Sequence, residues 1–136
     1  MHVVVIGGTR HVGPFIVREL ETVGHEVTVM NRGRTAANLP VDVRRVIVDR
    51  DQPGQVGQTL RDLSPDAVID MIGFTLDDVK EVVEAVPSLG HYLFCSSTAV
   101  YGVIGKSTPS EATPVAPDSA YTVGKVDCEN FLAEQH

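Results

Sequence analysis

The chain of 136 residues contains no tryptophan, two cysteines and few aromatic side chains, and it has no long hydrophobic run. No apolar stretch reaches the ~18 residues that a membrane-spanning helix needs, so the sequence predicts no membrane span. Cys95 and Cys128 lack the spacing of metal-ligating cysteines and are interpreted as reduced, buried thiols. The apolar segment at residues 3–6 is too short for a signal peptide, and no basic region precedes it. These absences predict a cytoplasmic protein without a metal site, and the length of 136 residues predicts a single domain.

Positive charge is scarce in the second part of the chain. Residues 1–61 carry eight arginines and six acids, a balance of +2, whereas residues 62–136 carry three lysines and twelve acids, a balance of −9. Because nucleic-acid binding depends on positive patches, the net charge of −7 disfavours nucleic acid as a partner. Arg10, Arg32 and Arg34 nevertheless gather positive charge in the first part, so a local basic patch stays open as an interpretation.

Apolar runs typical of buried strands alternate with helical patterns along the chain. Strands are expected at residues 3–6, 26–30, 45–48, 67–71 and 91–95, and helices at 12–23, 55–63, 76–86 and, capped by Asp118 or Ser119, up to Glu134. In the first helix we expect Phe15, Ile16, Leu20 and Val23 to form the buried stripe. A long functional loop is expected at residues 102–118. The alternation predicts an α/β fold, a Rossmann-type doubly wound parallel sheet with five strands.

The first expected strand runs directly into a glycine-rich turn. Placed between a buried strand and a helix, such a turn can hold a dinucleotide pyrophosphate against the helix N-terminus. Arg10 stands where a middle glycine is usual, and its guanidinium can bind a phosphate with two hydrogen bonds. An ordinary strand–helix turn without a ligand is the alternative. The candidate cofactor-binding residues of this turn are Gly7, Gly8, Thr9, Arg10, His11, Val12 and Gly13.

Residues after the next three strands complete the candidate cofactor site. NAD-specific folds place an acid after the second strand to bind the ribose 2′-hydroxyl, but this chain has Asn31 followed by Arg32. An acid would repel a 2′-phosphate and an arginine attracts it, so NADP(H) is favoured over NAD(H). Asp49 can accept a hydrogen bond from the adenine amino group, and a turn or capping role is the alternative. The further candidates for cofactor binding are Arg50, Met71, Ile72 and Gly73.

A tyrosine and a lysine lie one helical turn apart near the end of the sequence. Tyr121 and Lys125 are four residues apart and therefore share a helix face. An adjacent ammonium favours the phenolate, so Tyr121 can exchange a proton with an alcohol or carbonyl while hydride moves. The fifth strand ends in Ser96, Ser97 and Thr98, whose hydroxyls can orient a substrate oxygen. A chance helix pair is the alternative for the tyrosine and lysine taken alone.

With these motifs the chain resembles the short-chain dehydrogenases/reductases, in their extended, nucleotide-sugar epimerase/dehydratase subgroup. The resemblance covers essentially the whole chain and rests on the glycine turn, on residues 95–102 and 111–114, and on the tyrosine and lysine. It implies Ser97, Tyr121 and Lys125 as catalytic residues, the last two also as cofactor-binding residues. The implied function is that of an NAD(P)-dependent oxidoreductase or epimerase, with hydride transfer at a hydroxyl or carbonyl carbon of a sugar-nucleotide-like substrate.

Two positions depart from the pattern of the resembling enzymes. Their dehydratases place an Asp-Glu pair after the catalytic Ser or Thr, whereas this chain has Thr98 and Ala99, which disfavours dehydration. An arginine at position 10 in place of glycine makes the chain similar to a divergent branch of the family. This branch includes the chloroplast stem-loop-binding proteins, which use the fold to bind RNA and tend to lose the active-site tyrosine. Because Tyr121 is retained, an enzyme is favoured. The alternative is a non-catalytic module that senses NADP(H) or binds RNA.

The chain is short for the family that it resembles. Residues 1–136 are expected to form an NAD(P)-binding Rossmann domain that is truncated before the sixth strand, so the C-terminal substrate lobe is missing. We therefore expect the isolated chain to be inactive as an enzyme. The fifth strand, residues 91–95, would then be an unpaired apolar edge. Because such edges pair with other chains, we expect the isolated chain either to form a homodimer or to be poorly soluble.

Overall fold

The computed structural model describes residues 1–102 and 108–135. Part of the long loop expected at residues 102–118 lies outside the described residues. The chain divides into two compact units. The first unit comprises Met1–Ile72 and Lys80–Cys95, and the second comprises Gly73–Val79 and Ser96–His136.

The first unit is built on a five-stranded parallel sheet with the strand order β3-β2-β1-β4-β5. The strands are β1 (His2–Ile6), β2 (Glu26–Asn31), β3 (Arg44–Ile47), β4 (Ala67–Asp70) and β5 (His91–Phe94). In the central strand β1, Val4 pairs with Thr28 of β2 and with Val68 of β4. Residues 3–6 are all buried, as a continuous apolar run predicts for a strand covered on both faces. The expected Rossmann-type parallel sheet of five strands is thereby confirmed.

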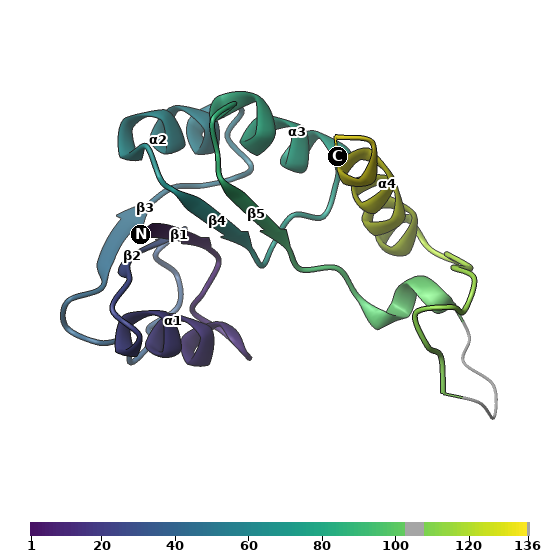
Figure 1. Ribbon diagram of the computed structural model, residues 1–136, viewed down its shortest axis with the longest axis horizontal. Helices are drawn as coiled ribbons and strands as arrows, with labels where there is room; N and C mark the ends of the chain where they lie inside the picture. The colour runs from purple at the N-terminus through teal and green to yellow at the C-terminus, as the bar shows by residue number, and fades with distance from the viewer. Residues whose placement is uncertain (103–107, 136) are drawn as a thin grey trace. The chain divides into compact units, whose positions relative to one another are not determined.

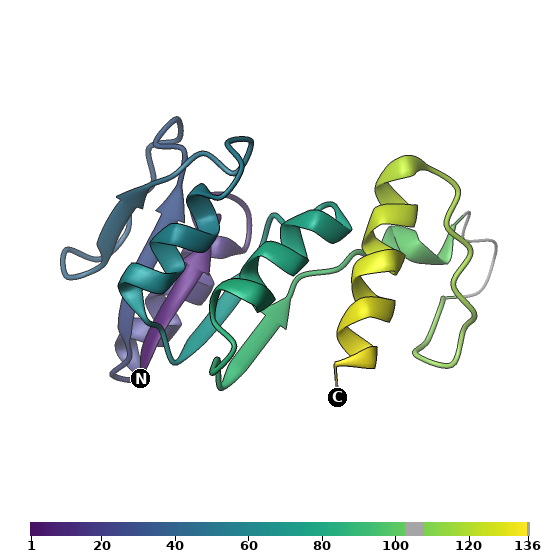
Figure 2. The same cartoon turned by 90° about the horizontal axis from the view of Figure 1, so that it is seen from above.

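Helices cover both faces of this sheet (Figure 1). They are α1 (Gly13–Thr22), α2 (Gln55–Leu63) and the latter part of α3 (Leu76–Ala85). On one face, Val17 of α1 packs in a cluster with Val5 of the sheet. On the other face, which α2 and α3 cover in Figure 2, Leu60 of α2 and Val82 of α3 belong to one cluster with Val4. The two helices lie side by side over the sheet in that view. Neighbouring residues of β1 therefore point to opposite cores, which is the sequence reason for its unbroken apolar run.

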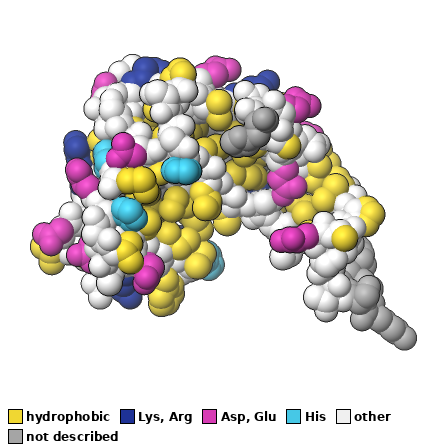
Figure 3. Space-filling view, viewed as in Figure 1, with side chains coloured by type: hydrophobic (Ala, Val, Ile, Leu, Met, Phe, Trp, Pro, Cys, Tyr) yellow, Lys and Arg dark blue, Asp and Glu magenta, His cyan; other side chains and the backbone are white. Residues whose placement is uncertain are grey.

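The buried side of α1 differs from the expected stripe. Phe15 and Val23, which were expected inside, are 66% and 60% exposed, whereas Val17 is fully buried. The buried line instead runs through Gly13, Val17 and the half-buried Leu20, at spacings of four and three residues. In the space-filling view, hydrophobic side chains accordingly lie on the surface over α1 (Figure 3).

The other expected elements are present, and their bounds move by no more than one residue. The predicted bounds of α2 agree with the structure at both ends. The strands expected to reach Met71 and Cys95 end one residue earlier. Such shifts are ordinary, because the last residue of an element is defined by a single hydrogen bond. Among the described residues, no helix is both long and apolar enough to span a membrane.

The second unit contains α4 (Ala120–Glu134), the 3-10 helix η1 (Thr98–Tyr101) and the start of α3. Ser119 caps α4, because its Oγ accepts a hydrogen bond from the N–H of Thr122 at 3.3 Å and the Thr122 hydroxyl accepts one from the N–H of Ser119 at 3.0 Å. Thr122, Lys125 and Cys128 form the buried side of the helix. The sequence did not predict η1, which begins directly after Ser97.

Candidate cofactor site and catalytic residues

The backbone turns sharply after β1 at two glycines. Gly7 and Gly8 have φ values of 103° and 55°, which side chains of L-residues rarely allow. The N–H of Gly7 donates to the carbonyl of Met30 at 2.8 Å, which ties the turn to β2. A Cβ at Gly7 would lie 3.1 Å from the side chains of both Met71 and Ile72. The turn therefore needs glycine both for its conformation and for its close approach to the end of β4.

The start of α1 packs against this same turn. A Cβ at Gly13 would lie 2.7 Å from the backbone carbon atoms of Gly8, so a side chain cannot fit there. Pro14 occupies the first helical turn, where a missing N–H costs no hydrogen bond. Arg10 and His11 are exposed beside it, and His11 has a φ of 51°. A helix N-terminus that approaches a glycine turn this closely offers free N–H groups and a positive dipole end to an anion.

The loops after β2 and β3 carry paired charges. Arg32 Nη1 lies 3.2 Å from Asp51 Oδ2, and Arg34 Nη2 lies 3.8 Å from Asp49 Oδ2. Asn31 Oδ1 accepts a hydrogen bond from the backbone N–H two residues later, at 2.7 Å. The carboxylates reduce the positive charge that the sequence suggested here. Exposed ion pairs contribute about 0–1 kcal/mol, so a phosphate can replace either carboxylate as the arginine's partner.

Arg50 is placed differently from the other arginines of the candidate site. Its side chain is 9% exposed, and its guanidinium donates two parallel hydrogen bonds, of 2.9 and 2.7 Å, to the carboxylate of Asp70. Asp70 is fully buried and also accepts from the N–H of Ile72 at 3.0 Å and the hydroxyl of Tyr92 at 3.1 Å. Sequence reasoning missed Asp70. The signal was a carboxylate ending an apolar strand, which requires several donors when it is buried.

The second unit holds the predicted tyrosine and lysine on one face of α4. Lys125 is 1% exposed, and its Nζ donates to the carbonyl of Gly73 at 2.7 Å. The same Nζ lies 5.9 Å from the centroid of the Tyr121 ring. Tyr121 is 44% exposed, so its ring is accessible to a ligand. The four-residue spacing therefore brings a fixed ammonium beside an accessible phenol, as the sequence predicted.

An aromatic side chain that the sequence did not single out joins this pair. The Phe74 ring centroid lies 5.2 Å from Lys125 Nζ and 6.0 Å from the centroid of Tyr121. The Asp78 carboxylate fixes the segment by accepting from the N–H of Phe74 at 2.8 Å. A Cβ at Gly124 would collide with the carbonyl oxygen of Phe74, so this glycine lets the segment reach α4. No sequence pattern pointed to Phe74, because the partners of its ring, Tyr121 and Lys125, are distant in the sequence.

The serines after β5 are also held in the second unit. Ser97 is the N-cap of η1, and its Oγ accepts from the N–H of Ala99 at 3.2 Å. The hydroxyl of Ser96 donates to the carboxylate of Glu129, which belongs to α4. Glu129 was missed, although it follows Lys125 by four residues and so continues the spacing that revealed the lysine. The contact fastens the residue before the predicted catalytic serine to the helix of the predicted catalytic lysine.

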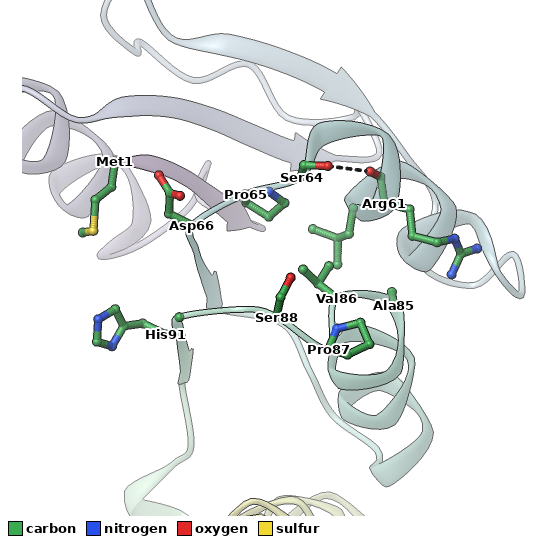
Figure 4. Close-up of a pocket in the computed structure, with 12 residues that line it drawn as sticks. Met1, Arg61, Ser64, Pro65, Asp66, Ala85, Val86, Pro87, Ser88 and His91 are labelled. Carbon is green, nitrogen blue, oxygen red and sulfur yellow. Dashed lines mark hydrogen bonds between the residues drawn. The ribbon is translucent and has the colours of Figure 1, made fainter.

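A cavity of about 580 Å³ opens elsewhere in the first unit (Figure 4). Met1, Asp66 and His91 line it, and they stand at the amino ends of β1, β4 and β5. Since these strands are parallel, the glycine turn that follows β1 lies at the opposite edge of the sheet. The cavity is therefore separate from the candidate cofactor residues. Within residues 1–102 and 108–135, no three His, Cys, Asp or Glu side chains gather into a metal site.

The parallel sheet and its glycine turn define a dinucleotide-binding fold of the Rossmann class. Residues 3–135 match the model of the NAD dependent epimerase/dehydratase family, and the chain belongs to this family. The family expected from the sequence motifs is thereby confirmed.

Curated relatives and solved structures are similar over nearly the whole chain. The 2′-dehydrokanamycin reductase of Streptomyces kanamyceticus is 32% identical over 97% of this chain and 38% of the relative. The chloroplast stem-loop binding protein of 41 kDa b of Arabidopsis thaliana is also 32% identical, over 96% of this chain and 38% of the relative. The Thermus thermophilus UDP-glucose 4-epimerase, solved in complex with NAD, is 25% identical with a TM-score of 0.85, over 98% of this chain and 50% of that chain. The chain thus spans half or less of the length of these proteins.

Proposed function

We propose that this chain supplies the dinucleotide-binding turn and the acid/base residues of an NAD(P)-dependent oxidoreductase or epimerase. The reaction is hydride transfer at a hydroxyl or carbonyl carbon of a sugar-nucleotide-like substrate. A bound nicotinamide dinucleotide would supply the acceptor or donor of the hydride. Tyr121 exchanges the proton at the substrate oxygen, Ser97 orients that oxygen, and Lys125 supports the tyrosine and binds the nicotinamide ribose. The matching family and the NAD-bound Thermus neighbour support this assignment. We place the reaction in the cytoplasm, where the two thiols stay reduced.

The observation that carries the proposal is the burial of Lys125 beside an accessible Tyr121. Placing a lysine in a protein interior costs desolvation energy, so a lysine that is 1% exposed calls for a specific reason. Its bond to the Gly73 carbonyl fixes the ammonium near the phenol ring. An ammonium held in this way stabilises a developing phenolate without moving during the reaction.

The test of the acid/base role is Tyr121→Phe in a polypeptide that contains the whole enzyme. UDP-glucose serves as the probe substrate because the Thermus neighbour is an epimerase of that compound. Removing the proton donor should lower turnover by ~100-fold or more, with cofactor affinity nearly unchanged. Tyr101→Phe removes the same oxygen from another tyrosine and serves as the matched control. Equal turnover in the Tyr121 variant and the wild type would refute the role.

For the cofactor we infer a preference for NADP(H) over NAD(H). Arg32 and Arg34 follow β2, and in this fold the residues after that strand contact the adenine ribose of a bound dinucleotide. Both arginines are exposed, and their carboxylate partners can give way to a 2′-phosphate. Parallel titrations with NADP+ and NAD+ test the preference. Equal affinity, or tighter binding of NAD+, would contradict it.

RNA binding without catalysis is the second candidate. The stem-loop binding protein of Arabidopsis thaliana is as identical to this chain as the reductase is, at 32%. Exposed arginines after β1 and β2 could contact an RNA backbone. The Tyr121→Phe variant separates the two functions, because RNA binding should not depend on a phenol proton. A gel-shift titration with a stem-loop RNA, repeated at two salt concentrations, measures the second candidate directly.

We also propose that the chain self-associates through β5. This strand ends the order of strands in the described sheet, and Leu93 on it is 57% exposed. An exposed apolar edge strand is a template for another strand. Analytical ultracentrifugation of the 136-residue chain should show dimers that grow with concentration, and Leu93→Lys should reduce them. A monomer at all concentrations would contradict the proposal.

A further inference from the structure

The ion pair of Arg50 and Asp70 joins the loop after β3 to the end of β4, and these two strands are not neighbours in the sheet. Arg50 follows β3, and Asp70 is the last residue of β4. In the sheet order, β2 and β1 lie between these two strands. At ~4.8 Å per strand, the strands themselves are ~14 Å apart. The loop after β3 must therefore fold inward, so that Arg50 reaches across the carboxyl ends of β2 and β1.

The carboxylate of Asp70 is also connected to the glycine turn. It accepts the N–H of Ile72 at 3.0 Å, so it sets the path of the chain immediately after β4. The side chain of Ile72 would lie 3.1 Å from a Cβ at Gly7 and thus forms one wall of the turn. The hydroxyl of Tyr92 on β5 donates to the same carboxylate at 3.1 Å. One carboxylate thereby ties together the loops after β3 and β4, strand β5 and, through Ile72, the turn after β1.

The energy of burying two charges indicates that the pair of Arg50 and Asp70 fixes the positions of loops and adds little to the stability of the fold. Taking two charges out of water offsets most of their attraction, and apolar residues of similar size often replace a buried pair without loss of stability. A bidentate guanidinium–carboxylate pair, in contrast, fixes direction as well as distance. The loops that this pair fixes carry Asp49, next to Arg50, and Ile72, both of which the sequence assigned to the cofactor.

We propose that Arg50 and Asp70 form a positioning pair for the dinucleotide. The pair holds Asp49 at the adenine end and Ile72 against the glycine turn, so that one bound dinucleotide meets both. Arg50 itself makes no contact with the cofactor, since both of its terminal nitrogens donate to Asp70 and its side chain is only 9% exposed. This inference rests on the proposed function, because it requires that the turn binds a nicotinamide dinucleotide.

The test replaces the whole pair with apolar residues, Arg50→Met together with Asp70→Leu. We expect the double variant to keep the thermal unfolding temperature of the wild type and to bind NAD+ and NADP+ at least ~10-fold more weakly, because small misplacements of binding groups cost large factors. Arg45→Met is the matched control. Arg45 lies on β3, and its guanidinium donates to the carbonyl of Ala37 near the surface. This control should bind both dinucleotides as the wild type does.

A second variant, Arg50→Lys, keeps the charge but cannot form the two parallel bonds. A positioning role predicts that lysine does not rescue affinity, while a role for charge alone predicts full rescue. Should the double variant fail to fold, the lysine variant decides the matter by the same binding measurement.

The outcomes separate this inference from the proposed function. Wild-type protein that binds neither dinucleotide overturns both. Wild-type binding with equally tight binding by the folded variants overturns the positioning pair and leaves the proposed function standing. A parallel fall of unfolding temperature and affinity in the lysine variant also overturns it, because the pair would then act through stability.

Discussion

Two cationic side chains with little exposure to solvent, Arg50 in the first unit and Lys125 in the second, are held in different ways. Arg50 gives both of its terminal nitrogens to the carboxylate of Asp70, which neutralises its charge. Lys125 donates to the carbonyl oxygen of Gly73 and faces the rings of Phe74 and Tyr121. The oxygen of a carbonyl carries only a partial negative charge, so this bond by itself does not neutralise the ammonium.

The two ways of holding a cation suit different roles, namely the positioning of loops and the stabilisation of charge during a reaction. A neutralised pair with two fixed bonds is suited to hold loops at a set distance. An ammonium that is fixed by a carbonyl and lies beside a phenol is suited to stabilise negative charge as it develops there. The first unit therefore has the features of a binding scaffold, and the second has those of an acid/base centre.

The largest effect is expected from Arg50→Met alone. This change leaves the buried carboxylate of Asp70 without its cation, which typically costs about 3–5 kcal/mol of stability. Urea unfolding followed by circular dichroism measures the loss, and Arg45→Met should show little change. If the Arg50 variant is as stable as the wild type, Asp70 does not depend on Arg50 for its burial, and the role given to this pair is wrong.

The counterpart in the second unit is Lys125→Met. Under the proposed function, turnover of the probe substrate UDP-glucose should fall by ~100-fold, because the tyrosine loses the charge that supports its phenolate. Cofactor affinity should fall less than turnover, since the glycine turn is untouched. Comparing kcat with the dissociation constant of the dinucleotide checks this. Loss of binding with unchanged kcat would reverse the assignment of roles to the two units.

Substitutions at two glycines test whether the turn of the first unit binds the dinucleotide. Gly13→Ala places a Cβ against the backbone of Gly8 and should weaken dinucleotide binding by ~10-fold or more, because the turn must move away from the helix. Gly24→Ala is the matched control, since a Cβ there meets nothing within 4 Å. The control still costs about 1–2 kcal/mol of stability for its φ of 86°. Equal binding by the two variants would show that the turn does not hold the ligand.

The smallest effect is expected on the preference between NADP+ and NAD+, from a change to the exposed ion pair of Arg32 and Asp51. Asp51→Asn frees Arg32 from its carboxylate and should raise the affinity for NADP+ over NAD+ by a few fold, as expected for an exposed pair worth under about 1 kcal/mol. The gain should shrink as salt is added, because exposed charges are screened. An unchanged ratio of the two affinities would remove Arg32 from the 2′-phosphate site.

Much of the fold follows from local sequence. The end of α2 at Leu63 was predicted because Ser64 and Pro65 interrupt the helical pattern directly after it. The buried face of α1 was predicted wrongly, because Phe15 is apolar but close packing at Gly13 turns the helix so that Val17 faces the sheet. Apolar spacing alone does not reveal which of two stripes a glycine contact will bury.

The candidate site was predicted where a motif is local and missed where contacts are distant. The tyrosine and lysine were found because they share one helix face. Phe74 and Asp70 were missed because their partners Lys125 and Arg50 are distant in the sequence. The burial of Arg50 likewise depends on a carboxylate twenty residues away, which no spacing rule connects to it.

The central claim is that the glycine turn after β1 binds a nicotinamide dinucleotide. Isothermal titration calorimetry of the chain with NADP+ and NAD+, run beside the Gly13→Ala variant, tests it most directly. We expect saturable binding by the wild type, tighter for NADP+ than for NAD+, and weaker binding by the variant. Absence of binding by the wild type, or equal binding by the variant, would contradict it.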